Sequence, residues 1–316
     1  MSNRIKMIIL AIMALSLVAI YMFSNLGSNL AYILPRRGFA VLAIAITGAT
    51  IAFSTIIFQT ITNNRILTPS ILGLDSLYIL IQTFIIFVFG STSFVAGDKN
   101  INFFISVGLM VLFAGVFYRI LFKGEGRNIY FLLLIGIILG TFFGSLSTFM
   151  QVLIDPNEFM VVQDRMFASF NNINTDILFV SIVLIIGVVI YFLKFTRYLD
   201  VLSLGKEHAV NLGVNYDYVV KRLLIVVAIL ISIATALVGP ITFLGLLVAN
   251  VTYEFLKTYR HSQLILASVF ISIIALIGGQ LIVDRVFSFS TTLSVIINFI
   301  GGVYFIYLLL RGSKNW

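Results

Sequence analysis

The segment Ser203-Leu204-Gly205-Lys206-Glu207-His208-Ala209-Val210-Asn211-Leu212-Gly213-Val214 is a polar stretch between two long apolar runs. It lies within residues 194–222, the longest basic interruption of the chain. Ser203 can cap the amino end of a helix, residues 204–212 can form about two turns, and Gly213 can supply the left-handed residue that ends it. The sequence therefore predicts a short helix at a membrane surface, which is either a handle for a soluble partner or an ordinary interfacial loop.

The composition around this segment is that of a membrane protein. Hydrophobic residues make up 60% of the 316 residues, charged residues make up 10%, and the mean hydropathy is +1.12. Soluble domains are far more polar than this. The chain is long enough for about ten apolar helices of roughly 20 residues each, and no polar tract is left over for a soluble domain. We therefore predict an all-α polytopic membrane protein in which residues 1–316 form a single transmembrane domain.

The content of charge, cysteine and histidine argues against several other classes. The formal net charge is +8, but a basic excess in short loops is also what orients a membrane protein, so we expect no nucleic acid partner. The chain has no cysteine and two histidines far apart, which excludes disulfides and argues against a transition-metal site built by the protein. We expect this chain to bind no cofactor and to contain no metal ligands.

Ten apolar stretches can each form a membrane-spanning helix. The first follows Arg4 and includes Lys6, as a signal peptide would, but no small-x-small cleavage site comes after it, so we expect a retained span. The stretches are 5–23, 39–61, 70–89, 101–122, 129–153, 177–195, 223–238, 241–256, 263–283 and 293–310. The shortest of them is 241–256.

The distribution of basic residues tests this count. With the amino terminus inside and every stretch crossing, 15 of the 20 Lys and Arg residues fall on the inner side. Because this bias orients membrane proteins, it supports about ten spans with both termini in the cytoplasm. The five outer exceptions are Arg36, Arg37, Lys99, Arg165 and Arg285.

Three of these exceptions, Arg36, Arg37 and Arg285, lie at the outer ends of the second and ninth stretches. Arginine forks pair well with carboxylates, so one interpretation is a docking surface for an acidic extracellular protein. The alternative is that these side chains only reach toward the membrane surface, or that Arg285 pairs locally with Asp284.

Small and polar residues recur at helical spacing within the apolar stretches. They are Gly136, Gly140, Gly144, Ser147 and Gln151 in the fifth stretch, and Gln59 among others in the second. Such stripes let helices approach closely, and they also line pathways for polar solutes, so both uses stay open. Ionisable residues are scarce within the stretches, which argues against a proton-driven or ion-driven carrier.

Motifs for enzyme chemistry are missing from the sequence. The chain lacks G-x-x-x-x-G-K-[ST] and so cannot hydrolyse ATP in the P-loop manner, and it also lacks His-Glu-x-x-His and G-x-S-x-G. We therefore predict a transport protein, not an enzyme, that is powered by a separate subunit. An ion-coupled carrier acting alone is the alternative from another class, and a membrane-embedded enzyme would lack a catalytic constellation here.

Four elements follow one another along the chain in a recognisable pattern. They are Leu34-Pro35-Arg36 followed by Gln59, then Asn64 with Pro69 and Leu72-Gly73, then residues 204–214, and then Gly239-Pro240-Ile241-x-Phe243-Leu244-Gly245-Leu246. Together they resemble the FecCD-type permeases of ATP-binding-cassette importers, and the resemblance covers essentially the whole chain. It implies a type II importer permease fold, in the bacterial cell membrane. The implied partners are a second permease, two ATPase subunits that use the ATP, and an extracellular or periplasmic binding protein.

The resemblance also implies roles for particular residues. The ATPase would dock on residues 203–214, and the coupling residues are Leu204, Gly205, Lys206, Glu207, Ala209, Leu212 and Gly213. Arg36, Arg37 and Arg285 would receive acidic residues of the binding protein. The translocation pathway would be lined by Gln59, Gly140, Gly144, Ser147 and Gln151.

Residues 63–76 resemble the branch of this family that handles catecholate siderophores such as petrobactin or anguibactin. In that branch two different permeases usually pair, so we expect a heterodimer that imports a ferric siderophore. Another chelate, such as haem or vitamin B12, is the alternative. The chain departs from the family pattern at Arg65, where proline is usual, and at Ala249-Asn250, where Pro-His is usual.

Overall fold

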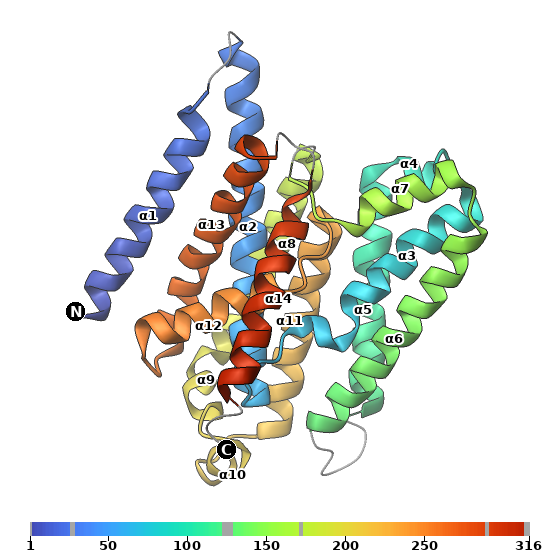
Figure 1. The fold of residues 1–316 in the computed structure, drawn as a ribbon. Coiled ribbons are helices and arrows are strands. Elements are labelled where there is room, and N and C mark those ends of the chain that lie inside the picture. The colour runs from blue at the N-terminus through green and yellow to red at the C-terminus, as the bar shows by residue number, and fades with distance from the viewer. Residues whose placement is uncertain (1, 26–28, 122–128, 171–172, 288–290, 313–316) are drawn as a thin grey trace.

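The computed structural model of the chain describes residues 2–25, 29–121, 129–170, 173–287 and 291–312. Over these residues the structure is a bundle of helices joined by short connections (Figure 1). The elements are α1 (Asn3–Phe23), α2 (Leu30–Thr62), η1 (Pro69–Leu72), α3 (Leu74–Phe89), α4 (Phe94–Gly97), α5 (Lys99–Leu121), α6 (Ile129–Leu153), α7 (Pro156–Met166), α8 (Thr175–Phe192), η2 (Leu193–Phe195), α9 (Thr196–Leu202), α10 (Lys206–Asn211), α11 (Tyr216–Val238), α12 (Leu244–Leu256), α13 (His261–Arg285) and α14 (Leu293–Gly312).

The main helices coincide with the predicted apolar stretches. These helices are α1, α2, α3, α5, α6, α8, α11, α12, α13 and α14. Within the described ranges, seven helices are long and apolar enough to cross a membrane, judged by length and composition. The shorter apolar helices are Leu74–Phe89, Leu244–Leu256 and Leu293–Leu308. The all-α polytopic fold is therefore confirmed, while full crossing by the three shorter helices stays a prediction.

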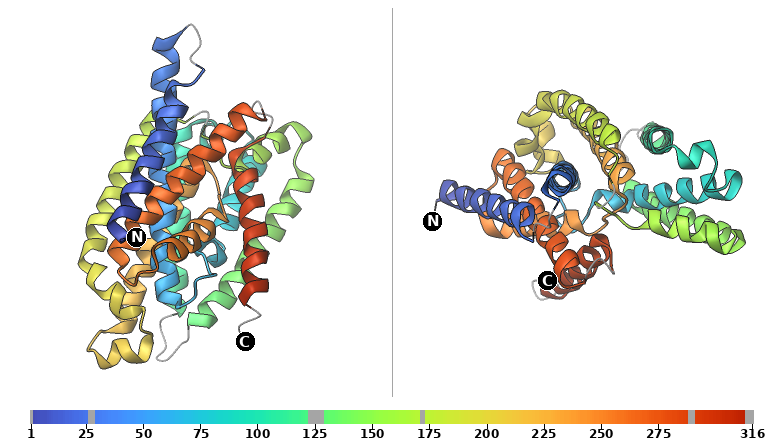
Figure 2. Two further views of the ribbon diagram at one scale, coloured as in Figure 1. Left: turned by 60° about the vertical axis from the view of Figure 1, so that its left-hand side comes forward. Right: turned by 90° about the horizontal axis from the view of Figure 1, so that it is seen from above.

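Helix α2 forms the centre of the bundle. Every residue from Thr50 to Thr62 is buried, and the helix packs most extensively against α13 and α11. A Cβ atom added at Gly48 would lie only 2.9 Å from Ser272 Oγ and from Leu276 Cδ1, so the glycine lets α13 approach closely. Seen from above, α2 is enclosed by its neighbours (Figure 2).

The two ends of the bundle carry different short elements. Helices α9 and α10 lie at one end, and α4 and α7 lie at the other (Figure 1). The amino end of α1 reaches the connection between α12 and α13, since Lys6 Nζ donates to the carbonyl oxygen of Phe255. Helix α14 ends on the α10 side (Figure 1). This arrangement agrees with the predicted topology, in which both termini share a side with residues 203–214, and the assignment of that side to the cytoplasm stays a prediction.

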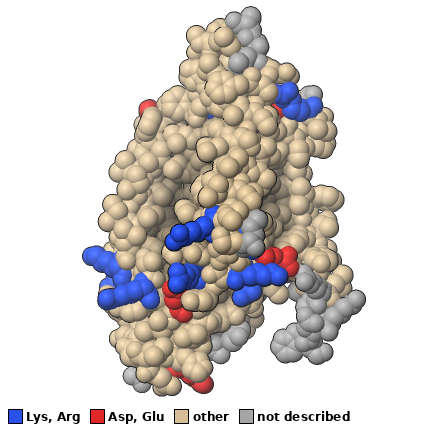
Figure 3. All heavy atoms as spheres, turned by 90° about the vertical axis from the view of Figure 1, so that its left-hand side faces the viewer, with Lys and Arg blue, Asp and Glu red and all other residues tan. Residues whose placement is uncertain are grey.

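The surface charge follows the same division. On the face toward α1, most Lys and Arg side chains form a band in the half that holds α10, with one group near the opposite end and an expanse of uncharged residues between (Figure 3). Lys123, Arg127 and Lys314, which the sequence places on the inner side, lie outside the described residues.

Helix α6 packs against η1 and α3 through glycine. A Cβ atom at Gly136 would lie 2.9 Å from the carbonyl oxygen of Ile71 and 3.0 Å from Leu72 Cα, which are backbone atoms. At Gly144, two turns further along, a Cβ atom would meet nothing within 4 Å. The first glycine is therefore required by the close approach of two backbones, and the second is not.

Gly136→Ala should destabilise the protein, whereas Gly144→Ala should not. Both replacements gain about 1 kcal/mol of helix propensity. At Gly136, however, the new methyl group meets backbone atoms that cannot rotate away, and such overpacking costs roughly 1–3 kcal/mol. Thermal unfolding of the two variants in detergent measures the difference. Equal midpoints would contradict the close packing of α6 on η1.

Candidate functional site

The predicted coupling segment forms a helical turn that projects from one end of the bundle (Figure 1). Helix α10 covers Lys206–Asn211, which is shorter than the predicted 204–212, and the chain reverses at two glycines with positive φ, Gly205 at 96° and Gly213 at 80°. The prediction that Gly213 supplies the left-handed residue is confirmed, whereas the prediction that Ser203 caps this helix is wrong. Ser203 instead ends the preceding helix α9, where its hydroxyl donates to the carbonyl oxygen of Asp200 at 2.7 Å.

One residue anchors this turn and the others point outward. Ala209 is completely buried, and its carbonyl oxygen accepts from the backbone N–H of Val214 at 3.0 Å. Three apolar side chains around it are strongly exposed: Leu204 (56%), Val210 (50%) and Leu212 (65%). The charged side chains of Lys206 and Glu207 are exposed beside them. An apolar surface rimmed by charge is typical of a protein interaction site.

Helix α11 follows immediately and begins with a side-chain cap. Asn215 is its N-cap residue, and its side-chain oxygen accepts from the backbone N–H of Tyr218 at 3.2 Å. Lys206 on α10 lies 3.7 Å from the Asp217 carboxylate in the first turn of α11. Both charges are largely exposed, so this pair contributes little to stability.

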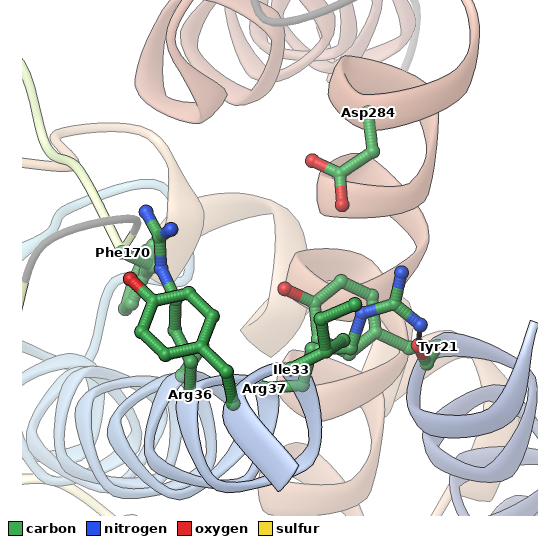
Figure 4. A pocket seen from close by; sticks show the side chains of 8 residues that line it. Tyr21, Ile33, Arg36, Arg37, Phe170 and Asp284 are labelled. Atoms are coloured by element: carbon green, nitrogen blue, oxygen red, sulfur yellow. Dashed lines mark hydrogen bonds between the residues drawn. The ribbon is translucent and has the colours of Figure 1, made fainter. Parts of the chain in front are cut away.

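At the opposite end of the bundle, two of the three predicted docking arginines, Arg36 and Arg37, line a cavity of about 410 Å³ (Figure 4). It lies between α1, α2 and α13 and is lined by Tyr21, Tyr32, Ile33, Arg36, Arg37, Ala40, Phe170 and Asp284. The two neighbouring arginines diverge, with Arg36 directed toward Phe170 and Arg37 lying beside Tyr21 (Figure 4).

Arg37 closes the carboxyl end of α1. Its guanidinium Nη1 donates to the carbonyl oxygens of Tyr21 (3.0 Å), Met22 (3.2 Å) and Ser24 (2.7 Å). The last carbonyls of a helix lack partners within the helix and carry partial negative charge, so a cation there satisfies and stabilises them. Arg285 also reaches this point, because its Nη2 donates to Ser24 Oγ. Two of the three predicted docking arginines thus hold the end of α1, and the third, Arg36, is exposed and lines the cavity.

Comparison with known proteins identifies the family of this chain. Residues 5–311 match the model of the FecCD transport family. The chain belongs to this family. Its members are transport proteins, so the chain is a multi-pass membrane permease and not an enzyme.

Individual relatives of this FecCD protein match most or all of the chain. It is 66% identical over 316 residues to the petrobactin import system permease protein YclO of Bacillus subtilis, with all of both chains aligned. It is 38% identical to the petrobactin import system permease protein FatC of Bacillus anthracis, over 88% of this chain and 79% of the relative. A solved structure described as an inward-facing metal-chelate type ABC transporter matches with a TM-score of 0.81 at 20% identity, over 98% of this chain and 100% of that chain. The type II importer permease fold is therefore confirmed.

The residues predicted to line a pathway fall into two groups in this FecCD fold. Ser147 and Gln151 on α6 both bond to Thr83 on α3, with oxygen–oxygen and nitrogen–oxygen distances of 2.9 and 3.2 Å. Gly140 packs against the residue that precedes α3, since a Cβ atom there would lie 3.2 Å from Gly73 Cα. Gln59 lies elsewhere, buried in α2 with its Nε2 atom 2.7 Å from the carbonyl oxygen of Arg65. These contacts are close packing within one permease, and the pathway role of these residues stays a prediction.

Sequence reasoning counted Arg165 only as an outer charge and missed its contacts. The side chain lies on α7 and donates to Gln82 Oε1 on α3 at 2.6 Å and to the carbonyl oxygen of Ala96 on α4 at 2.7 Å. Burial lowers the pKa of this guanidinium, but an arginine remains charged at neutral pH. Arg165 therefore fixes helix α7 onto the bundle. In the sequence, the signal that could have indicated a special role is its place among the few basic residues predicted on the outer side.

Arg37→Gln should lower the thermal stability of the permease, and Arg37→Lys should lower it less. Hydrogen bonds to charged groups contribute roughly 1.5–3 kcal/mol each. Lysine retains the charge at the end of α1, but its single ammonium cannot reach all the carbonyl oxygens that the fork reaches. Unfolding midpoints in detergent test this order. A midpoint for Arg37→Gln equal to that of the unmodified protein would show that Arg37 does not hold α1.

Proposed function

We propose that this chain is the permease subunit of an ATP-driven importer that carries a ferric siderophore of the petrobactin type into the bacterial cytoplasm. The observation that carries the proposal is the 66% identity, over the full length of both chains, to a protein named as a petrobactin import permease. The match runs along the whole of both chains, so it takes in the parts that would contact substrate and partners. The 38% identical relative FatC bears the same substrate in its name.

The proposed assembly contains two different permeases, two ATPases and a binding protein. Each of the two Bacillus species has a second, less similar petrobactin import permease, YclN in one and FatD in the other. This supports a heterodimer in which the partner of the present chain resembles those second proteins. The ATPase subunits would supply the P-loop that this sequence lacks.

The geometry suggests how the parts work together. The ATPases would close on the exposed surface of Leu204, Lys206, Glu207, Val210 and Leu212. The loaded binding protein would dock at the opposite end, near Arg36. The ferric siderophore would pass between the two permeases by alternating access, and the chelator would hold the iron throughout. ATP binding and hydrolysis would then switch the access from one side of the membrane to the other.

Uptake by the complete importer in proteoliposomes tests this function. Ferric petrobactin supplied with the binding protein should accumulate only when ATP is present inside with the ATPases. Excess ferric hydroxamate or vitamin B12 should not compete. Failure to transport ferric petrobactin, together with uptake of another chelate, would overturn the substrate assignment. Uptake by the purified chain without any ATPase would instead favour an ion-coupled carrier.

Two variants in the same assay test the coupling residues. Gly213→Leu places a side chain at a φ of 80°, a conformation that costs roughly 1–2 kcal/mol for an L-residue, so the turn after α10 should reorganise. Glu207→Lys reverses an exposed charge at the proposed ATPase contact. Both should abolish uptake while the protein still inserts into the membrane. Normal uptake in both variants would exclude α10 as the coupling element.

Arg36→Glu should weaken docking of the binding protein by roughly tenfold or more, because like charges juxtaposed in an interface cost several kcal/mol. The loss should be larger at low salt, where charges are less screened. Arg4→Glu makes the same charge change at the exposed amino end of α1, away from the docking face, and should leave docking unchanged. Binding of the loaded binding protein to the permease in nanodiscs measures both. If the binding protein bound both variants with equal affinity, Arg36 would have no role in docking.

A further inference from the structure

A chain of polar side chains joins three helices at the end of the bundle that holds α10. The Asp200 carboxylate on α9 accepts from the backbone N–H of His261 at 3.0 Å and lies 2.6 Å from His261 Nδ1. The other ring nitrogen, Nε2, lies 2.9 Å from Thr60 Oγ1 on α2. We call this chain of three side chains the Asp200 link. It spans residues far apart in the sequence and connects α9, α13 and α2.

His261 is the central member of the Asp200 link. The carboxylate of Asp200 only accepts, so His261 Nδ1 carries the hydrogen of that bond. The Thr60 hydroxyl lies 2.9 Å from His261 Nε2 and 2.8 Å from the carbonyl oxygen of Ile56. His261 therefore uses both ring nitrogens, with Nδ1 bonded to α9 and Nε2 bonded to α2. Because the His261 and Thr60 side chains are buried, neither can exchange its partner for water without moving the helices apart.

Asp200 also supplies the cap that α13 lacks in its own sequence. The N-cap residue of α13 is Arg260, which makes no side-chain hydrogen bond to the helix. The first N–H groups of a helix need acceptors, and a negative charge is stabilising at that end. The carboxylate from α9 meets both needs. Helix α9 consequently holds α13 by its amino end.

The Asp200 link lies between the proposed coupling segment and the two helices that reach the outer cavity. Helix α9 leads directly into α10, and it is seated in the bundle by Leu199 and Leu202, which are both completely buried. Helices α2 and α13 pack closely along their length and carry Arg37 and Asp284 at their far ends. A movement of α9 would therefore shift α13 and α2 together.

We propose that the Asp200 link transmits movement of the coupling segment to α2 and α13, and through them to the outer cavity. This inference rests on the proposed function, because it takes α10 as the element that the ATPase moves. Asp200, His261 and Thr60 act as positioning residues, since none of them contacts substrate. The bond to Thr60 is the step most open to test, because valine has nearly the shape of threonine and lacks the hydroxyl group.

A distance measurement in the complete importer tests the link without relying on the substrate. The chain has no cysteine, so spin labels can be introduced at single sites. Suitable positions are Phe94 on α4 and Val286 at the outer end of α13, which are 74% and 70% exposed. A non-hydrolysable ATP analogue should change the distance between these labels in the unmodified complex. Thr60→Val should abolish this change, and Thr60→Ser, which keeps the hydroxyl, should restore it.

Transport measured in parallel gives the size of the effect and its control. Thr60→Val and Asp200→Asn should each lower ferric petrobactin uptake per ATP hydrolysed about fivefold or more, the range of ordinary coupling between sites. The double variant should be no worse than either single variant, because both interrupt one chain. Thr50→Val is the matched control: this buried threonine on α2 donates only to its own helix, at Ile46, and should behave as the unmodified protein.

Three results would overturn the link. They are an unchanged distance response in Thr60→Val, an equal loss in Thr50→Val, and a complex in which nucleotide moves no labels at all. Failure of the proposed function is recognised separately, since it would appear as absent ferric petrobactin uptake by the unmodified importer. A nucleotide response that depends on Thr60 would support the link even then.

Discussion

Close packing between α2 and α13 is the interaction on which the rest of the structure depends. Inside a membrane the hydrophobic effect contributes little to helix association, so close packing and satisfied polar groups must hold the bundle together. Gly48 brings the two helices close, and several threonines of α2 donate their hydroxyls to carbonyl oxygens of their own helix, as Thr50 does to Ile46 at 2.7 Å and Thr55 does to Ile51 at 2.8 Å. A helix with this many hydroxyls can therefore be buried without a polar partner at every turn.

The same pair of helices connects the two functional ends of the permease. At the end that carries α4 and α7, Arg37 fastens the carboxyl end of α1 beside α2, and Arg285 of α13 reaches the same point. Toward the other end, Lys6 fastens the amino end of α1 to the last carbonyl group but one of α12, that of Phe255. Charges thus act mainly where helices end, because only there are backbone groups left without partners. In the apolar middle of the bundle, close packing holds the helices together.

The helical part of the fold could be predicted from sequence because apolar length and the bias of basic residues act locally. Apart from α10, the short elements could not be predicted in this way. Helix α9 was missed because residues 196–202 mix apolar and charged positions, and its presence is why Ser203 ends one helix instead of starting the next. Likewise the contacts of Arg37 and of His261 join residues distant in the chain, and no spacing rule indicates them. The proposed docking and coupling segments were chosen by pattern and stay predictions, whereas the different contacts of Arg37 and Arg285 could be found only in three dimensions.

The two departures from the family pattern meet in space, which changes their meaning. Asn250 Nδ2 donates to the carbonyl oxygen of Arg65 at 2.9 Å, and the Gln59 amide donates to the same oxygen at 2.7 Å. The Arg65 guanidinium lies over the Tyr253 ring, 4.7 Å from its centre, one turn beyond Asn250. A proline at position 65 would keep the carbonyl group but could not make the cation–π contact. Arg65 and Asn250 therefore form one joint contact between the end of α2 and α12, so the two departures are better understood as a matched exchange than as two separate losses.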